Sequence, residues 1–134
     1  MKIRTSLRTA IANEMLAAIT TGTLGSPKLE IYSGSMPAAI GDAISGTLLA
    51  EFTLTNTFGT VSDGVITLDP IDPDTDPAAT GTAGFGRLLD RDGNEVLYMT
   101  VSVVGSGGEI QLSSLDIAPG EPVSISSGVI RAGA

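Results

Sequence analysis

The chain has 134 residues, of which 42% are hydrophobic, 4% aromatic and 16% charged, and its 7 basic and 15 acidic side chains give a net charge of −8. That acidic balance disfavours binding to nucleic acid or to an anionic membrane surface, because both attract clusters of Lys and Arg. The chain contains no Cys and no His. Disulfides, zinc held by Cys or His, and Ser-His-Asp or Cys-His catalysis are therefore excluded.

Residues 5–20 form the one segment with a helical pattern. Its apolar residues recur three or four positions apart, at Leu7, Ile11, Met15 and Ala18 or Ile19. This spacing predicts a helix with a narrow apolar stripe that lies against its own sheet or against a neighbouring molecule. We expect Thr5 or Ser6 to cap its start and Gly22 to end it in the left-handed conformation.

The same N-terminal region matches neither a leader nor a membrane span. It begins with basic residues, but Arg8, Asn13 and Glu14 interrupt any apolar run, so we do not expect a signal peptide. No apolar run elsewhere approaches the roughly 20 residues that a membrane-spanning helix needs.

The rest of the chain alternates apolar and polar residues with a period of two, between turns rich in Gly, Pro, Asp and Ser. This pattern predicts half-buried β-strands. About eight are expected, at residues 28–33, 47–54, 58–61, 65–68, 83–89, 96–103, 110–112 and 123–129. We predict a mainly β single domain over residues 1–134, an antiparallel β-sandwich or jelly roll across residues 28–130 with one N-terminal α-helix.

The clearest two-strand unit runs from Thr82 to Val104. In its first strand Phe85 and Arg87 alternate with Gly84 and Gly86, so the two sets lie on opposite faces. An Asp-Gly step then supplies the tight turn of a hairpin. The predicted core residues are Leu29, Ile31, Phe52, Leu54, Phe85, Met99 and Val101.

Residues 69–77, with the sequence DPIDPDTDP, resemble the start of a calcium-binding loop. Counted from Asp72, acids occupy the first, third and fifth positions. Pro77 and Ala83 then fall where an EF-hand needs its Gly and its bidentate Glu, so an EF-hand is excluded. We interpret this segment as a solvated acidic loop stiffened by prolines and expect no metal there.

Two other patterns have plain structural explanations. Asp90, Asp92 and Asn94 alternate like calcium ligands, but such side chains bond their own backbone in a hairpin turn. Gly105 to Gly108 resembles a phosphate-binding loop in composition alone, since no Lys-Ser/Thr follows it, and we predict a hairpin turn.

Paired carboxylates could serve a glycosidase, but the chain has few aromatic residues for a sugar platform. We expect no enzyme, no catalytic residue and no cofactor.

Several segments together resemble a known class of proteins. Residues 4–10 (RTSLRTA) and 28–37 (KLEIYSGSMP) resemble the opening helix and first strand of small virion proteins encoded in the structural modules of tailed bacteriophages. Residues 45–50, 80–83 and 120–130 are similar as well. The resemblance covers most of the chain in scattered pieces, and its motifs are structural rather than catalytic.

The resemblance implies a function as well as a fold. Some such proteins are head decoration or cement proteins, with jelly-roll folds that bind over the joints between capsid subunits. It therefore implies a virion protein on the capsid exterior that binds the major capsid protein and forms a dimer or trimer. The acidic loop at residues 69–77 and the Gly-Phe-Gly at residues 84–86 depart from the pattern, so a tail or connector protein stays open. A carbohydrate-binding β-sandwich is a further alternative.

Charge placement predicts a contact surface for a partner. Lys2, Arg4 and Arg8 supply three of the seven basic residues, at the start of a helix where the dipole disfavours cations. An acidic partner would explain this placement, either a capsid subunit or residues 69–76 of a second copy. Ile3 and Leu7 would add apolar burial. The predicted contact residues are Lys2, Ile3, Arg4, Leu7 and Arg8.

Overall fold

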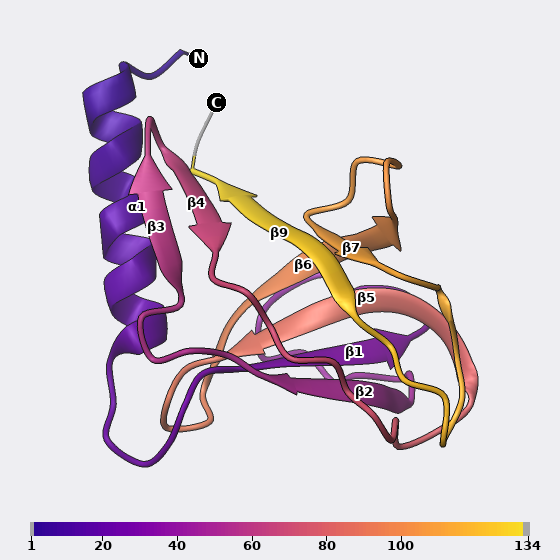
Figure 1. The fold of residues 1–134 in the computed structure, drawn as a ribbon. Coiled ribbons are helices and arrows are strands. Elements are labelled where there is room, and N and C mark those ends of the chain that lie inside the picture. The colour runs from indigo at the N-terminus through magenta and orange to yellow at the C-terminus, as the bar shows by residue number, and fades with distance from the viewer. Residues whose placement is uncertain (1, 133–134) are drawn as a thin grey trace.

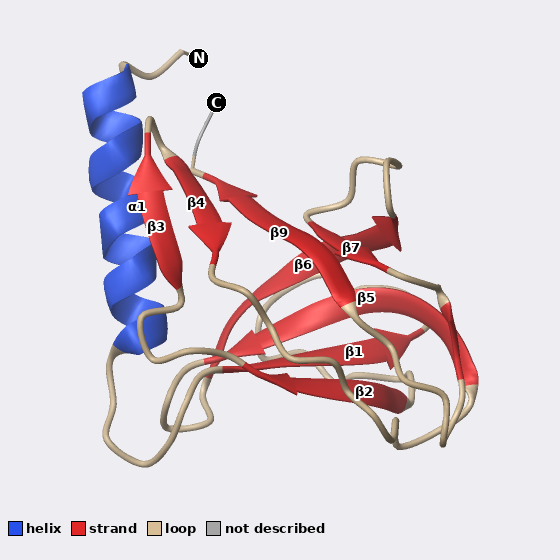
Figure 2. Ribbon diagram, viewed as in Figure 1, coloured by secondary structure: helices blue, strands red, loops and turns tan. Residues whose placement is uncertain are grey.

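The structure is a computed structural model that describes residues 2–132, and it contains one helix and nine strands (Figures 1 and 2). The elements are α1 (Thr5–Thr20), β1 (Lys28–Ser33), β2 (Leu48–Thr53), β3 (Gly59–Ser62), β4 (Val65–Leu68), β5 (Gly81–Leu89), β6 (Glu95–Val103), β7 (Ile110–Leu112), β8 (Asp116–Ile117) and β9 (Ile125–Arg131). The mainly β fold with one N-terminal helix is thus confirmed. Only β8 was not expected.

The strands form one mixed sheet in the order β2-β1-β5-β6-β7-β9-β4-β3, with β8 beside β5. The sheet curls, so the part with β1, β2 and β5 lies across from β4 and β9 (Figure 1). One pair, β6–β7, is parallel and aligns Val101 with Ile110. The predicted hairpin turn at Gly105 to Gly108 is therefore wrong. Parallel strands run in the same direction, so the chain must double back between them, and Gly105 and Gly107 permit this with φ of 85° and 87°.

The core fills the space inside the curl. A cluster of buried side chains extends along the sequence from Ala12 to Ala132. Five predicted core residues are buried within it, Leu29, Ile31, Phe52, Leu54 and Met99, and Val101 packs against it half-buried. Phe85 is also fully buried, but outside this cluster. It lies on the other face of the sheet, as described below.

The bounds of α1 agree with the predicted helix, but its caps differ. The N-cap is Arg4, whose carbonyl accepts the first helical hydrogen bonds and whose side chain caps nothing. The hydroxyl of Thr5 instead accepts a hydrogen bond from the Arg8 guanidinium at 3.2 Å. At the other end Thr21 is the C-cap, and Gly22 follows with φ of 129°.

The packed face of α1 is also rotated from the predicted stripe. Ala12 and Ile19 are its fully buried residues, and the helix contacts β3 and β4. Ile11 and Met15 are only half-buried, and Leu7 is 51% exposed. The predicted stripe therefore lies along one flank of the packed face rather than at its centre.

Candidate functional site

The loop between β1 and β2, residues 34–47 (loop 34–47), is held at its base and in its middle. At the base the Ser33 N–H donates to the Thr47 carbonyl at 3.0 Å, and the Thr47 N–H donates to the Ser33 hydroxyl at 2.9 Å. In the middle the Gly41 N–H donates to Glu95 Oε2 in β6 at 3.0 Å. These bonds fix a long irregular segment against the sheet.

Two glycines allow the close backbone contacts at the base of this loop. A Cβ on Gly46 would lie 1.8 Å from the Ser33 carbonyl oxygen, and a Cβ on Gly84 would lie 1.9 Å from the Gly34 carbonyl oxygen. Both distances are far below van der Waals contact. No larger residue fits either position without moving the backbone.

A cluster of aromatic and charged side chains lies on the same side as loop 34–47. Because Leu29 and Ile31 of β1 point into the core, Glu30 and Tyr32 point to the opposite face. We name this group the outer-face cluster, and its members are Glu30, Tyr32, Phe85, Arg87, Glu95 and Tyr98. It draws one pair of residues from each of β1, β5 and β6.

Phe85 is the apolar centre of the outer-face cluster. Its ring stacks on Tyr32 with centroids 5.6 Å apart and planes 12° apart. Tyr98 meets it edge-on, at 5.6 Å and 79°. Both are favourable arrangements for aromatic pairs. The two tyrosines shield Phe85, which has no exposed surface.

Arg87 is the charged centre of the outer-face cluster. Its Nη1 lies 3.5 Å from Glu30 Oε1 and donates a hydrogen bond to the Tyr32 hydroxyl at 3.2 Å. Its buried Nε lies 3.1 Å from Glu95 Oε1 but makes no aligned hydrogen bond within the described residues, so this contact is an ionic attraction. Since Glu95 also holds Gly41, the network links loop 34–47 to the sheet.

Both tyrosines of the outer-face cluster have a pKa above the ordinary value. Burial raises the pKa of Tyr32, and the nearby charge of Glu30 raises it further. Burial likewise raises the pKa of Tyr98, followed by its hydrogen bond to Glu95. At neutral pH both hydroxyls are therefore hydrogen-bond donors. Through Glu95, this arrangement positions loop 34–47.

The predicted contact residues lie together at the start of α1. Lys2 and Arg4 are exposed, Leu7 is largely exposed, and Ile3 and Arg8 are half-buried. Within residues 2–132 none of the three cations forms an ion pair. The structure thus gathers the predicted set on one end of the molecule, and its role as a partner contact stays a prediction.

A fourth cation joins this end, which the sequence did not indicate. β9 pairs with β4 so that Arg131 lies opposite Val65. The neighbouring Gly64 accepts a hydrogen bond from the Ala132 N–H at 2.9 Å and lies against Arg8. Four of the seven basic residues therefore share one end of an acidic molecule.

The aspartates of the acidic segment at residues 69–77 accept hydrogen bonds from other parts of the same chain. Asp69 accepts hydrogen bonds from the hydroxyls of Thr57 and Thr55, and these bonds lower its pKa. Asp74 Oδ2 accepts from the Glu51 N–H at 3.0 Å, and Asp76 Oδ1 accepts from Gly120 at 3.1 Å. These carboxylates serve as acceptors for the fold.

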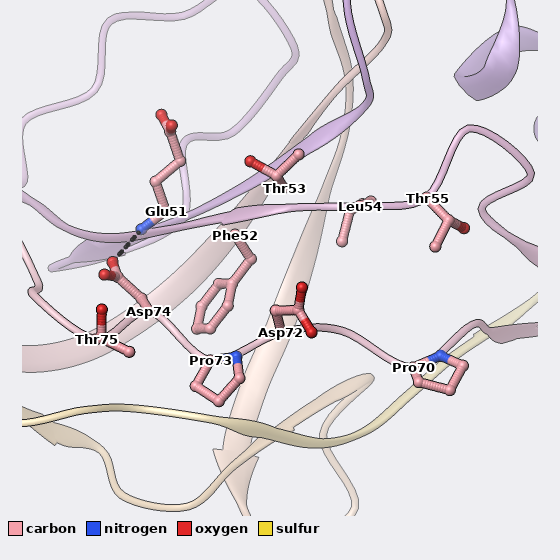
Figure 3. Close-up of a pocket in the computed structure, with 10 residues that line it drawn as sticks. All are labelled: Glu51, Phe52, Thr53, Leu54, Thr55, Pro70, Asp72, Pro73, Asp74 and Thr75. Atoms are coloured by element: carbon pink, nitrogen blue, oxygen red, sulfur yellow. Dashed lines mark hydrogen bonds between the residues drawn. The ribbon is translucent and has the colours of Figure 1, made fainter.

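This segment lines an open depression of about 480 Å³ beside β2 (Figure 3). The Glu51 carboxylate points away from Asp72 and Asp74, so the acids do not converge. Across the part of the chain that the structure describes, no group of three or more acidic side chains is placed to hold a metal ion. That residues 69–77 bind no calcium stays a prediction.

In the β5–β6 turn the Asp90 side chain bonds to the backbone of the turn, as predicted. Asp90 Oδ1 accepts from the N–H groups of Asp92 and Asn94 at 3.0 and 2.9 Å. Asp92 Oδ1 accepts from Thr23 at 3.0 Å and Leu24 at 3.2 Å, just beyond α1. The turn is therefore bonded to the end of the helix, a contact that the sequence did not indicate.

Searches with the chain against family models, curated proteins and solved structures found no match. Within residues 2–132 no helix is long and apolar enough to cross a membrane. Every aromatic side chain is buried or half-buried, with Phe52 and Phe58 in the core and the other three in the outer-face cluster. These rings offer no open platform on which a sugar could stack.

Proposed function

We propose that the chain is a structural virion protein of a tailed bacteriophage, a decoration or cement protein that binds the outer surface of the capsid and stabilises the shell. Its partner would be the major capsid protein, and it would need no cofactor. The resemblance of residues 4–10 and 28–37 to small virion proteins supports this class. The observation that carries the proposal is the architecture of loop 34–47.

Loop 34–47 is built as a rigid contact element. Irregular loops of about 12–15 residues or more are uncommon in compact domains, and they are usually either functional or disordered. This one presents Met36, 39% exposed, and Ile40, 50% exposed, on a backbone fixed by Glu95. A fixed loop loses little conformational entropy when it binds. Many copies on one shell would add weak single contacts into firm attachment.

The test uses capsid shells that lack the protein, prepared from the bacteriophage that encodes it. A variant with Met36→Ser and Ile40→Ser should bind these shells at least about tenfold more weakly than the parent chain, because it loses two apolar contacts. The matched control, Leu24→Ser with Val104→Ser, changes two exposed apolar residues elsewhere and should bind normally. Equal binding by all three proteins would exclude loop 34–47 as the contact.

A further inference from the structure

α1 has more apolar residues than it buries in the core. Between Ala10 and Ile19 only Asn13 and Glu14 are polar. Ala12 and Ile19 are nonetheless its only fully buried residues. A helix that is apolar around most of its circumference is normally covered on most sides.

The less covered flank of α1 is one wall of an open groove of about 550 Å³. The helix wall consists of Ala10, Ile11, Met15 and Ala18, and the start of β6 supplies Val96 and Leu97. Glu14 is the single charged residue that lines the groove. This flank belongs to the helix at the left edge of the molecule in Figure 1. An occupant must therefore be largely apolar and must fit beside a helix.

The charges at the start of α1 are opposite to those that its dipole favours, and an acid lies beside its end. The positive N-terminal end has no acid in its first turn and carries Lys2, Arg4 and Arg8. The negative C-terminal end has no base in its last turn and is bonded to Asp92 through the backbone of the following loop. Arg91 lies at this end as well, with its Cβ beside Gly22, and its guanidinium donates to the Gly25 carbonyl at 2.7 Å.

We propose that the groove binds α1 of a second copy of this chain in antiparallel orientation, which forms a two-fold symmetric dimer. An antiparallel helix brings its cationic start beside Asp92 at the end of the first helix, and the symmetry repeats the contact. Both ends of each helix then gain charges that complement its dipole. The N-terminal cations thus acquire an acidic partner, the turn at Asp92 rather than residues 69–76.

One register pairs the helix ends and packs apolar residues against each other, and it also brings the Glu14 side chains of the two copies near the symmetry axis. When Arg4 lies beside Gly22 of the second copy, and so near its Asp92, Ile11 lies opposite Met15 of that copy. The reciprocal contact follows from the symmetry. Ala10 and Ala18 are small and allow the two helices to approach closely. The half-buried side chains of each copy then fill the groove of the other.

The proposal is independent of capsid binding, and its test uses the purified full chain alone. Sedimentation equilibrium from micromolar to submillimolar concentration should give twice the 13.5 kDa mass of one chain. Ala18→Lys puts a charge into the groove, opposite the like charge of Arg8 in the second copy, and should weaken the dimer at least about tenfold. Ala17→Lys is the matched control, because Ala17 is exposed on the same helix but does not line the groove. A monomeric parent chain, or Ala18→Lys chains that dimerise normally, would overturn the proposal.

Orientation is tested in the same protein, because the natural chain has no cysteine to interfere. Chains with Ile11→Cys are mixed with chains with Met15→Cys and oxidised mildly. Antiparallel helices should give mainly the mixed disulfide, since these positions face each other across the dimer. A product dominated by Ile11→Cys chains linked to one another would indicate parallel helices and contradict the charge argument.

Discussion

At the scale of single residues, Arg87 connects the sheet to its outer loop. It lies between Glu30 and Glu95, and its neighbours Tyr32 and Tyr98 enclose Phe85. Half-buried ion pairs of this kind add more to the definition of one geometry than to net stability, because desolvation offsets much of the attraction. The geometry fixed here is that of loop 34–47.

The two tyrosines provide a direct measurement of this cluster. The fold raises the pKa of both Tyr32 and Tyr98 above the ordinary value. Their contribution to stability is therefore complete below the pKa of the unfolded chain, about 10, and is lost as pH rises through the folded pKa. The chain has two Tyr and no Trp, so tyrosinate absorbance reports on these residues alone. We expect both midpoints above that of the urea-unfolded chain. Midpoints at or below it would contradict the described cluster.

At the scale of secondary-structure elements, Phe85 links the stability of β5 to the order of loop 34–47. Phe85→Ala should lower the free energy of unfolding by about 3–5 kcal/mol, because the ring is fully buried. It should also make the loop more susceptible to proteolysis, since both tyrosines lose their partner. Denaturant unfolding and limited proteolysis measure the two effects. Leu24→Ala, at an 81% exposed position, is the control and should change stability little. A similarly small effect of Phe85→Ala would contradict the packing.

Local signals in the sequence predicted the elements well. Helical spacing predicted α1, and the turns around Asp63-Gly64 and Asp92-Gly93 separated the strands of two hairpins. The orientation of α1 was not predictable, because apolar residues occur around most of the helix. Alternation placed Phe85 and Gly86 on opposite faces, but it could not tell which face was the core. That depends on the long-range pairing of β5 with β1.

The candidate site was only partly visible in the sequence. The N-terminal cations were identified from their charge, whereas Arg131 joins them only because β9 pairs with β4. Likewise, Glu30, Arg87 and Glu95 come from three strands that only the sheet brings together. A charged residue in an otherwise apolar strand was the one sign in the sequence that such residues matter. The sequence alone did not show which of these charged residues pair with one another.

At the scale of the whole molecule, the distribution of acids predicts independence from calcium. Asp69, Asp74 and Asp76 are bonded to separate internal donors, so no common ligand set remains. Neither a chelator nor added calcium should shift the melting temperature measured by calorimetry. Stabilisation by several degrees in calcium would show that the segment binds the ion.

We propose above all that this protein binds the outside of a bacteriophage capsid through loop 34–47. Electron cryomicroscopy of shells incubated with the purified protein tests it most directly. We predict added density on the outer surface of the shell, with Met36 and Ile40 facing the capsid subunits. Density confined to the tail or the connector, or shells that remain bare at saturating protein, would contradict the account.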